Sequence, residues 1–349
     1  MAEAILALRG WHPALSRAEA VAMFPEAEIK RTNGHRLLTM SGDTDYSRAT
    51  QLSGTEAVLI GGGISQWDSV ESLIEKINFT PQESMKVICW RHEGKIPETS
   101  TMEIAQNLGG RFSDLGATID LENPEHRYGV VLDASTGLVA WGWMDGQGPG
   151  KHGWSAMRAN KRPFFKPVSL EPRLARAVVN IAAGPGSDLI VDPMCGTGGL
   201  LIESALCDRP TLGIDVDPEM VEGAITNLEW AGVTAEVRRD DATQFEIRDK
   251  VSGVVLDPPY GRNSQGTVDD EILLSSTLEN IRSQVEQGCG FVLIMPTTPD
   301  RIDFVEEIKS KEYHELFIDN GWQIDACYGI PIHSSLARQV IIASASPQD

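Results

Sequence analysis

Long hydrophobic runs are missing from this sequence of 349 residues. No apolar stretch approaches the roughly 18 residues that a membrane-spanning helix requires, so the sequence predicts no membrane contact. The start of the chain also lacks the basic region and long apolar segment of a signal peptide. We therefore expect a soluble, cytoplasmic protein.

Cysteine is scarce and scattered. The five cysteines include no C-x-x-C pair, and the seven histidines show no metal-ligand spacing. This pattern argues against a disulfide framework and a structural zinc site, and predicts no bound metal. The ordinary share of hydrophobic residues, 41%, excludes a wholly disordered chain.

Positive charge is scarce as well. Ten lysines and twenty arginines stand against fifty acidic residues, which gives a net charge of −20. That sign is unfavourable for binding a nucleic acid. The exception is the stretch 151–176, which carries seven basic residues and one acid, Glu171. A polyanion, if one binds, is expected at this stretch.

The first 160 residues alternate short strand-like and helical patterns, which predicts an α+β region. A strand is expected at 5–8 and paired strands at 128–132 and 137–141. The glycines Gly61–Gly63 predict a turn or linker between two small subdomains.

Two capping boxes predict helices in the same region. Ser16-x-x-Glu19 predicts a helix that ends near Phe24, and Ser100-x-x-Glu103 predicts one that Gly109–Gly110 stops. The stretch 144–168 is rich in glycine, proline and basic residues and predicts a linker.

From Pro172 onward, apolar strands and helices alternate. A helix is expected to begin at Pro172 and to end before Gly184. Strands are then predicted at 189–191, 212–214, 235–237, 253–256 and 291–294, with helices at 199–207, 218–230 and 270–286. This alternation predicts a mostly parallel sheet with both faces covered.

A glycine-rich loop follows the first of these strands. Asp192-Pro-Met-Cys195-Gly196-Thr197-Gly198 stands where a doubly wound sheet binds its ligand. The loop begins with a carboxylate and has no nearby cation, so it disfavours a pyrophosphate, and hence a nicotinamide dehydrogenase, and favours a cationic ligand. S-adenosylmethionine carries a sulfonium and an ammonium, and we expect it as the cofactor.

Acidic residues also follow the later strands. Asp215 is expected to accept hydrogen bonds from ribose hydroxyls, and Asp217 to cap the helix that Pro218 begins. Asp241 is expected to accept a hydrogen bond from the adenine amine. With Asp192 and Asp257, these carboxylates predict a cofactor site at the carboxyl ends of the strands.

The fourth strand ends in Asp257-Pro258-Pro259-Tyr260. The two prolines fix a rigid loop. Its chemistry suits methylation of an exocyclic amine, whose lone pair is delocalised into a base. Asp257 and the Pro258 carbonyl are expected to accept the amine hydrogens, and Tyr260 to stack on a flipped base.

These segments together resemble the archaeal tRNA guanosine-10 N2-methyltransferases. The resemblance rests on the loop that starts at Asp192, on Asp257-Pro-Pro-Tyr-Gly-Arg262 and on Arg162-Pro-Phe-Phe-Lys-Pro167. Further similar segments are 172–180, 221–229 and 333–338. Residues 108–132 resemble a THUMP domain, a module that recognises tRNA in this family.

The resemblance implies a Rossmann-like class I methyltransferase domain with a seven-stranded, mostly parallel sheet. The expected organisation is a ferredoxin-like segment at 1–60, a THUMP domain at 61–145, a basic linker at 146–170 and the methyltransferase domain at 171–349. It also implies a monomer that binds tRNA and S-adenosylmethionine. Cofactor contacts are expected from Asp192, Cys195, Gly196, Thr197, Gly198, Asp215, Asp241 and Asp257, and RNA contacts from Lys161, Arg162, Lys166 and Arg262.

The expected reaction is the transfer of one or two methyl groups to N2 of guanosine 10 in tRNA. The main alternative is the same reaction at another guanosine, such as guanosine 6 of tRNA or a ribosomal RNA guanine. Methylation of adenine N6 in DNA, and a non-catalytic RNA-binding protein, are less favoured alternatives.

Overall fold

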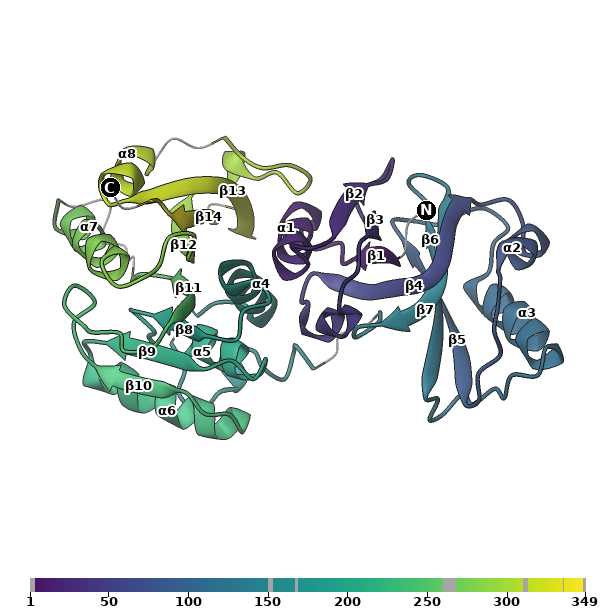
Figure 1. Ribbon diagram of the computed structural model, residues 1–349, viewed down its shortest axis with the longest axis horizontal. Helices are drawn as coiled ribbons and strands as arrows, with labels where there is room; N and C mark the ends of the chain where they lie inside the picture. The colour runs from purple at the N-terminus through teal and green to yellow at the C-terminus, as the bar shows by residue number, and fades with distance from the viewer. Residues whose placement is uncertain are drawn as a thin grey trace. The chain divides into compact units, whose positions relative to one another are not determined.

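The computed structural model describes residues 4–149, 153–166, 169–259, 268–309, 313–334 and 336–347. The chain divides into two compact units, Met1–Gly150 and Lys151–Asp349. Within the described residues, each unit is built on one seven-stranded sheet (Figure 1). No helix among the described residues is long and apolar enough to cross a membrane.

The sheet of the first unit has the strand order β2-β3-β1-β4-β7-β6-β5. Its neighbours pair antiparallel except β5 and β6, which are parallel. The strands are β1 (Ala4–Leu8), β2 (Glu28–Arg31), β3 (Leu37–Ser41), β4 (Thr55–Gln66), β5 (Met85–His92), β6 (His126–Asp133) and β7 (Leu138–Asp145). The helices are α1 (Pro13–Met23), the 3-10 helix η1 (Tyr46–Gln51), α2 (Val70–Lys76) and α3 (Thr101–Asp114).

Strand β1 is apolar throughout because both of its faces are buried. Leu6 and Leu8 pack in a core with Ala20 and Met23 of α1. The alternate residue Ile5 packs in a different core with Leu59. Successive side chains of a strand point to opposite faces, so a central strand needs a continuous apolar run.

The predicted turn at Gly61–Gly63 is wrong, because these glycines lie inside β4. The pairing of β4 with β7 shifts register between Ile60 and Gly63. A Cβ on Gly62 would lie 1.7 Å from the Trp141 carbonyl oxygen. The glycines therefore allow a close approach of two strands, and the expected boundary at residue 60 falls within a single strand.

The two capping boxes predicted in the first unit have different outcomes. Helix α1 begins at Pro13, because His12 caps it through a bond from the Leu15 N–H to its Nδ1 at 3.1 Å, so the predicted start at Ser16 is wrong. Ser100 does cap α3, as predicted. However, α3 continues through Gly109–Gly110 to Asp114, because the buried Phe112 stabilises its last turn.

The sheet of the second unit has the order β10-β9-β8-β11-β12-β14-β13. The five strands from β10 to β12 are parallel, and β14 is antiparallel to both of its neighbours. The strands are β8 (Leu189–Asp192), β9 (Thr211–Asp215), β10 (Glu236–Arg239), β11 (Val251–Leu256), β12 (Gly290–Thr297), β13 (Trp322–His333) and β14 (Leu336–Ala345). The predicted mostly parallel, seven-stranded α/β sheet is confirmed.

Helices cover both faces of this sheet. They are η2 (Ala159–Lys161), α4 (Pro172–Ala183), α5 (Gly199–Ala205), α6 (Pro218–Ala231), α7 (Val268–Arg282), η3 (Pro299–Arg301) and α8 (His314–Asp319). Leu278 of α7 and Phe317 of α8 share one core with Val254 of β11. On the opposite face, a Cβ on Gly253 would lie 2.5 Å from the Ala182 carbonyl oxygen, so glycine lets α4 approach β11 closely.

The order of the strands fixes where a ligand can bind. From β8 the chain adds β9 and β10 on one side and then returns to place β11 on the other side of β8. In an open α/β sheet, ligands bind at the carboxyl ends of the strands at such a reversal. The residues that follow β8, β9, β10 and β11 are therefore the candidates for a site.

Candidate active site

The glycine-rich turn after β8 has the left-handed backbone that its sequence permits. Gly196 has φ 49° and Gly198 has φ 77°, values that residues with a Cβ rarely adopt. A Cβ on Gly196 would have no atom within 4 Å, so the backbone faces open space there. The Cys195 N–H donates to the Ile214 carbonyl at 2.8 Å and ties the turn to β9.

Cys195 itself is a packing residue. Its side chain is buried, and its Sγ would lie 3.0 Å from a Cβ on Gly213. Burial and the nearby carboxylates of Asp192 and Asp215 raise the pKa of the Cys195 thiol far above its usual range. A raised pKa makes this thiol a poor nucleophile, because only the thiolate is reactive.

Asp215 connects the end of β9 to the glycine turn. One carboxylate oxygen accepts from the Gly196 N–H and the other from the Asp217 N–H, each at 2.9 Å. Each oxygen keeps a further lone pair. The next residue, Val216, is apolar and 68% exposed. Sequence reasoning gave Val216 no role; its only signal was its place directly after a strand-end acid.

Asp192 is the most deeply buried carboxylate of this edge, at 1% exposure. It accepts from the Met194 N–H at 3.2 Å. Burial raises the pKa of Asp192 well above its ordinary value, and the charges of Asp257 and Asp215 raise it further. The structure thus brings together three strand-end acids, and a positive charge placed among them would be favoured.

Asp257 follows β11 at the same edge, with a side chain 17% exposed. Arg338, near the start of β14, places its Nη2 4.0 Å from Oδ2 of Asp257. Sequence reasoning gave Arg338 no role, although it closes the segment 333–338. The prolines Pro258 and Pro259 follow in the described chain, whereas Tyr260 and Arg262 lie outside the described residues.

Asp241 follows β10, and its carboxylate accepts from both the Thr243 N–H, at 2.9 Å, and the Thr243 hydroxyl, at 2.8 Å. These bonds lower the pKa of Asp241. Its loop is anchored by α7, because the Asn280 amide donates to the carbonyls of Ala242 and Phe245 at 3.2 Å. The loop therefore holds a charged carboxylate in a fixed place near the end of β9.

The basic segment before α4 packs against α6 within the second unit. The Phe164 N–H donates to Asn227 Oδ1 at 3.0 Å, and the Asn227 amide donates to the carbonyls of Phe164 and Thr197 at 2.9 Å. A Cβ on Gly223 would lie 2.0 Å from the Phe164 ring. The buried Asn227, which sequence reasoning gave no role, thus links this segment to the glycine turn.

Two of the basic side chains expected to contact RNA are already engaged. Arg162 is 5% exposed and donates from Nε and Nη2 to the Met157 carbonyl at 3.3 and 3.2 Å. Its guanidinium therefore faces groups of the protein itself, and an RNA contact by Arg162 stays a prediction. Lys166 pairs with Glu219 at 2.9 Å, whereas Lys161 is exposed.

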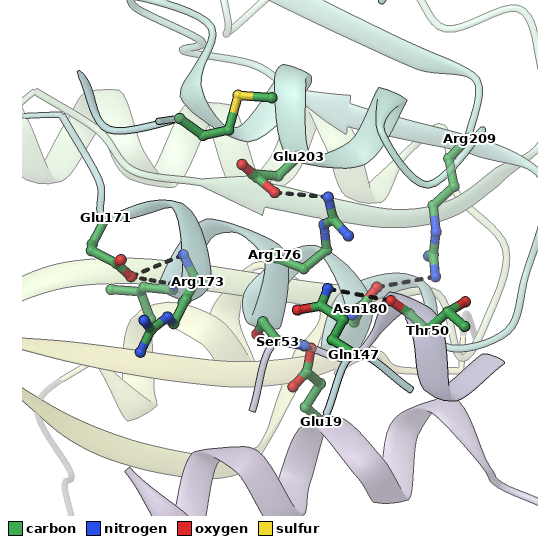
Figure 2. Close-up of polar contacts among 12 residues, drawn as sticks. Glu19, Thr50, Ser53, Gln147, Glu171, Arg173, Arg176, Asn180, Glu203 and Arg209 are labelled. Carbon is green, nitrogen blue, oxygen red and sulfur yellow. Dashed lines mark hydrogen bonds and ion pairs between the residues drawn. The ribbon is translucent and has the colours of Figure 1, made fainter. Parts of the chain in front are cut away.

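A second set of buried charges lies between α4 and α5 (Figure 2). Arg176 and Glu203 form an ion pair at 2.8 Å and point toward one another. Burial raises the pKa of Glu203, and the cations of Arg176 and Arg162 oppose that rise. Nearby, Arg209 donates to Asn180 at 3.3 Å. The ion pair compensates part of the charge buried between the two helices, although Glu203 Oε1 and Arg176 Nε have no hydrogen-bond partner among the described residues.

The sheet order, the glycine turn and the acids at the carboxyl ends of the strands define a Rossmann-like domain of the methyltransferase class. Residues 159–324 match the model of the RMKL-like methyltransferase domain family.

Named relatives extend this match. The chain is 36% identical over 192 residues to the tRNA (guanine(10)-N2)-dimethyltransferase of Methanothermobacter thermautotrophicus, covering 54% of this chain and 53% of that protein. It is 28% identical over 352 residues to the protein of that name from Pyrococcus abyssi, covering 96% and 98%. It is 33% identical to the probable enzyme of Methanothermococcus thermolithotrophicus, covering 42% of this chain and 90% of that protein. The chain belongs to the tRNA (guanine(10)-N2)-dimethyltransferase family.

Proposed function

We propose that the protein transfers one or two methyl groups from S-adenosylmethionine to N2 of guanosine 10 in tRNA. The observation that carries this proposal is the gathering of Asp192, Asp215 and Asp257 beside an open glycine turn. That arrangement favours a cationic cofactor and puts the Asp257 carboxylate next to it. The names of its archaeal relatives supply the target nucleotide.

The residues at this edge fit S-adenosylmethionine. The free lone pairs of Asp215 suit the ribose hydroxyls, and the exposed Val216 offers an apolar surface for the adenine. Asp192 supplies negative charge for the positively charged end of the cofactor. When bound, the cofactor supplies a methyl group activated by its attachment to a sulfonium.

Asp257 and the Pro258 carbonyl perform the remaining chemistry. The amino group of guanine is a weak nucleophile, because its lone pair is delocalised into the ring. Two acceptors that bind its hydrogens favour a pyramidal nitrogen and aim the lone pair at the methyl carbon. As the nitrogen–carbon bond forms and the carbon–sulfur bond breaks, the nitrogen loses a proton, and Asp257 is placed to receive it.

We further propose that the first unit, with the expected THUMP domain, binds the tRNA. Lys161, which is exposed, is the first candidate for a phosphate contact, and Arg162, Lys166 and Arg262 stay candidates. All five cysteines are free thiols, which fits a protein of the reducing cytoplasm.

The test uses purified enzyme and S-adenosylmethionine with, in separate reactions, unmodified tRNA transcripts or ribosomal RNA, followed by mass-spectrometric mapping of the nucleosides. The expected product is N2-methylguanosine or N2,N2-dimethylguanosine at position 10, and a transcript with adenosine at that position should not be methylated there. Product at guanosine 6, or in ribosomal RNA alone, would instead establish the alternative target. Binding of the cofactor without transfer to any RNA would contradict the proposal.

A further inference from the structure

Arg338 is an arginine buried at the edge where the parallel strands end. Only 8% of its surface is exposed. It lies near the start of β14, opposite Pro296 of β12. Because β14 runs antiparallel to β12, its first residues lie at the edge where β11 and β12 end. A segment distant in the sequence thus brings a permanent positive charge to the candidate active site.

The charge of Arg338 faces an acid in a crowded negative region. Its Nη2 lies 4.0 Å from Oδ2 of Asp257. Asp192, at the end of β8, and Asp257 repel one another as like charges. Asp215, at the end of β9, is a third carboxylate of this cluster. Nearby like charges favour protonation of a carboxyl group, whereas a nearby guanidinium favours its ionised form. The two influences on Asp257 are therefore opposed.

We propose that Arg338 is a positioning residue for methyl transfer, which keeps the Asp257 carboxylate ionised and oriented toward the amino group of the target base. The inference rests on the proposed function, because it concerns the same site. An ionised Asp257 can accept both a hydrogen bond and the departing proton, whereas a protonated one can no longer take that proton.

The geometry favours this role over a direct contact with an RNA phosphate. Both partners are largely buried, with side chains 10% and 17% exposed. At such exposure an ion pair is screened much less than on the surface. A phosphate contact would act on the binding of tRNA, whereas a positioning role acts on the chemical step, and kinetics can separate the two.

The experiment compares the full-length wild type with Arg338→Gln and Arg338→Lys. Arg238→Gln is the matched control, because Arg238 pairs with Glu236 at 2.6 Å on the surface of the same sheet, where loss of the pair should cost little. Thermal melting and the binding of S-adenosylmethionine establish that each variant is folded.

For Arg338→Gln we expect kcat to fall by about 10- to 100-fold, with KM values for tRNA and cofactor within about 2-fold of the wild type. The acid limb of the pH–rate profile should move to higher pH, since loss of the cation disfavours ionised Asp257. Arg338→Lys keeps the charge but loses the planar fork. Its kcat should fall by roughly 3- to 10-fold without a shift of the acid limb.

A double-mutant cycle tests whether Arg338 acts through Asp257. In an Asp257→Asn background, adding Arg338→Gln should change the single-turnover rate by less than about 2-fold.

Equal kcat in the wild type and both Arg338 variants would overturn the inference, as would fully multiplicative effects with a raised KM for tRNA. Should Arg338→Gln not fold, the Lys variant decides: a wild-type kcat for it overturns the inference. Absence of methyl transfer by the wild type would instead refute the proposed function.

Discussion

Two buried carboxylates, Glu56 in the first unit and Asp192 in the second, have opposite environments. Glu56 accepts from Trp90 at 2.7 Å, contacts His92 at 2.8 Å and lies 3.7 Å from Arg36. Burial by itself raises the pKa of Glu56. The opposing effects of His92, Arg36 and Trp90 are together larger, so the pKa lies below its ordinary value. Asp192 is buried among acids, and its pKa is raised.

The difference separates a carboxylate that holds a fold together from one that awaits a ligand. The chain provides Glu56 with cationic and hydrogen-bonding partners, so its burial is compensated within the protein. For Asp192, the charged groups that act on it are carboxylates, and the compensation would come from a cationic ligand. Acids whose pKa is strongly shifted occur often at functional sites, and Asp192 stands at the carboxyl end of a parallel strand, where ligands bind.

The largest expected effect concerns the acid that faces the substrate. Asp257→Ala should lower the methyl-transfer rate by about 10³-fold, because it removes the acceptor that orients the amine and takes its proton. The measurement is single-turnover transfer of a labelled methyl group to tRNA. Melting temperature and cofactor binding should persist in this variant. Retained activity would remove Asp257 from the mechanism.

Asp192→Asn tests the ligand-binding side of the comparison. We expect the dissociation constant for S-adenosylmethionine to rise by about 10- to 100-fold, because the buried negative charge is lost. The ligand-free enzyme should become more stable, by roughly 1 kcal/mol, because a buried, uncompensated acid is removed. Calorimetric titration and urea unfolding measure the two effects. A less stable variant with unchanged cofactor affinity would make Asp192 a structural acid like Glu56.

Glu56→Gln tests the structural side. We expect the free energy of unfolding to fall by about 3 kcal/mol, since Arg36 loses the charge that compensates its burial, and Trp90 and His92 lose a charged partner. Affinity for S-adenosylmethionine should be unchanged. Urea unfolding measures the change in stability. A loss of cofactor affinity would show that the two clusters are coupled.

The parallel strands of the second unit and the helices between them could be predicted from the sequence for a physical reason. Parallel strands buried on both faces are short apolar runs between helices, and caps such as Asp217–Pro218 mark where those helices begin. The antiparallel strands β13 and β14 were not predicted. Strand β13 contains Pro331, a residue that normally argues against a strand.

Local signals failed where tertiary contacts decided the structure. Gly61–Gly63 predicts a turn by composition, yet β4 passes through it because β7 supplies the pairing. Among the site residues, strand-end acids could be expected to gather, because the topology requires it. The contact of Arg338 with Asp257 could not be expected, because nothing in the local sequence indicates which acid a distant arginine contacts. Likewise, the burial of Arg162 depends on the Met157 carbonyl and Glu203, which the basic run does not reveal.

The smallest expected effect is the pH dependence of stability, which should differ in sign for the two acids. Asp192 has a pKa raised above the ordinary 3.8. The unfolded chain therefore ionises first, and this group makes the protein less stable as pH rises from about 3.8 toward the raised value. Glu56 has a pKa lowered from 4.5, so its contribution is present above that pH and is lost as pH falls below it.

Urea unfolding between about pH 3 and 7 should thus show that Asp192→Asn gains stability over the wild type as pH rises. The deficit of Glu56→Gln should shrink as pH falls. If both differences had the same sign, the two acids would not be held in opposite electrostatic environments.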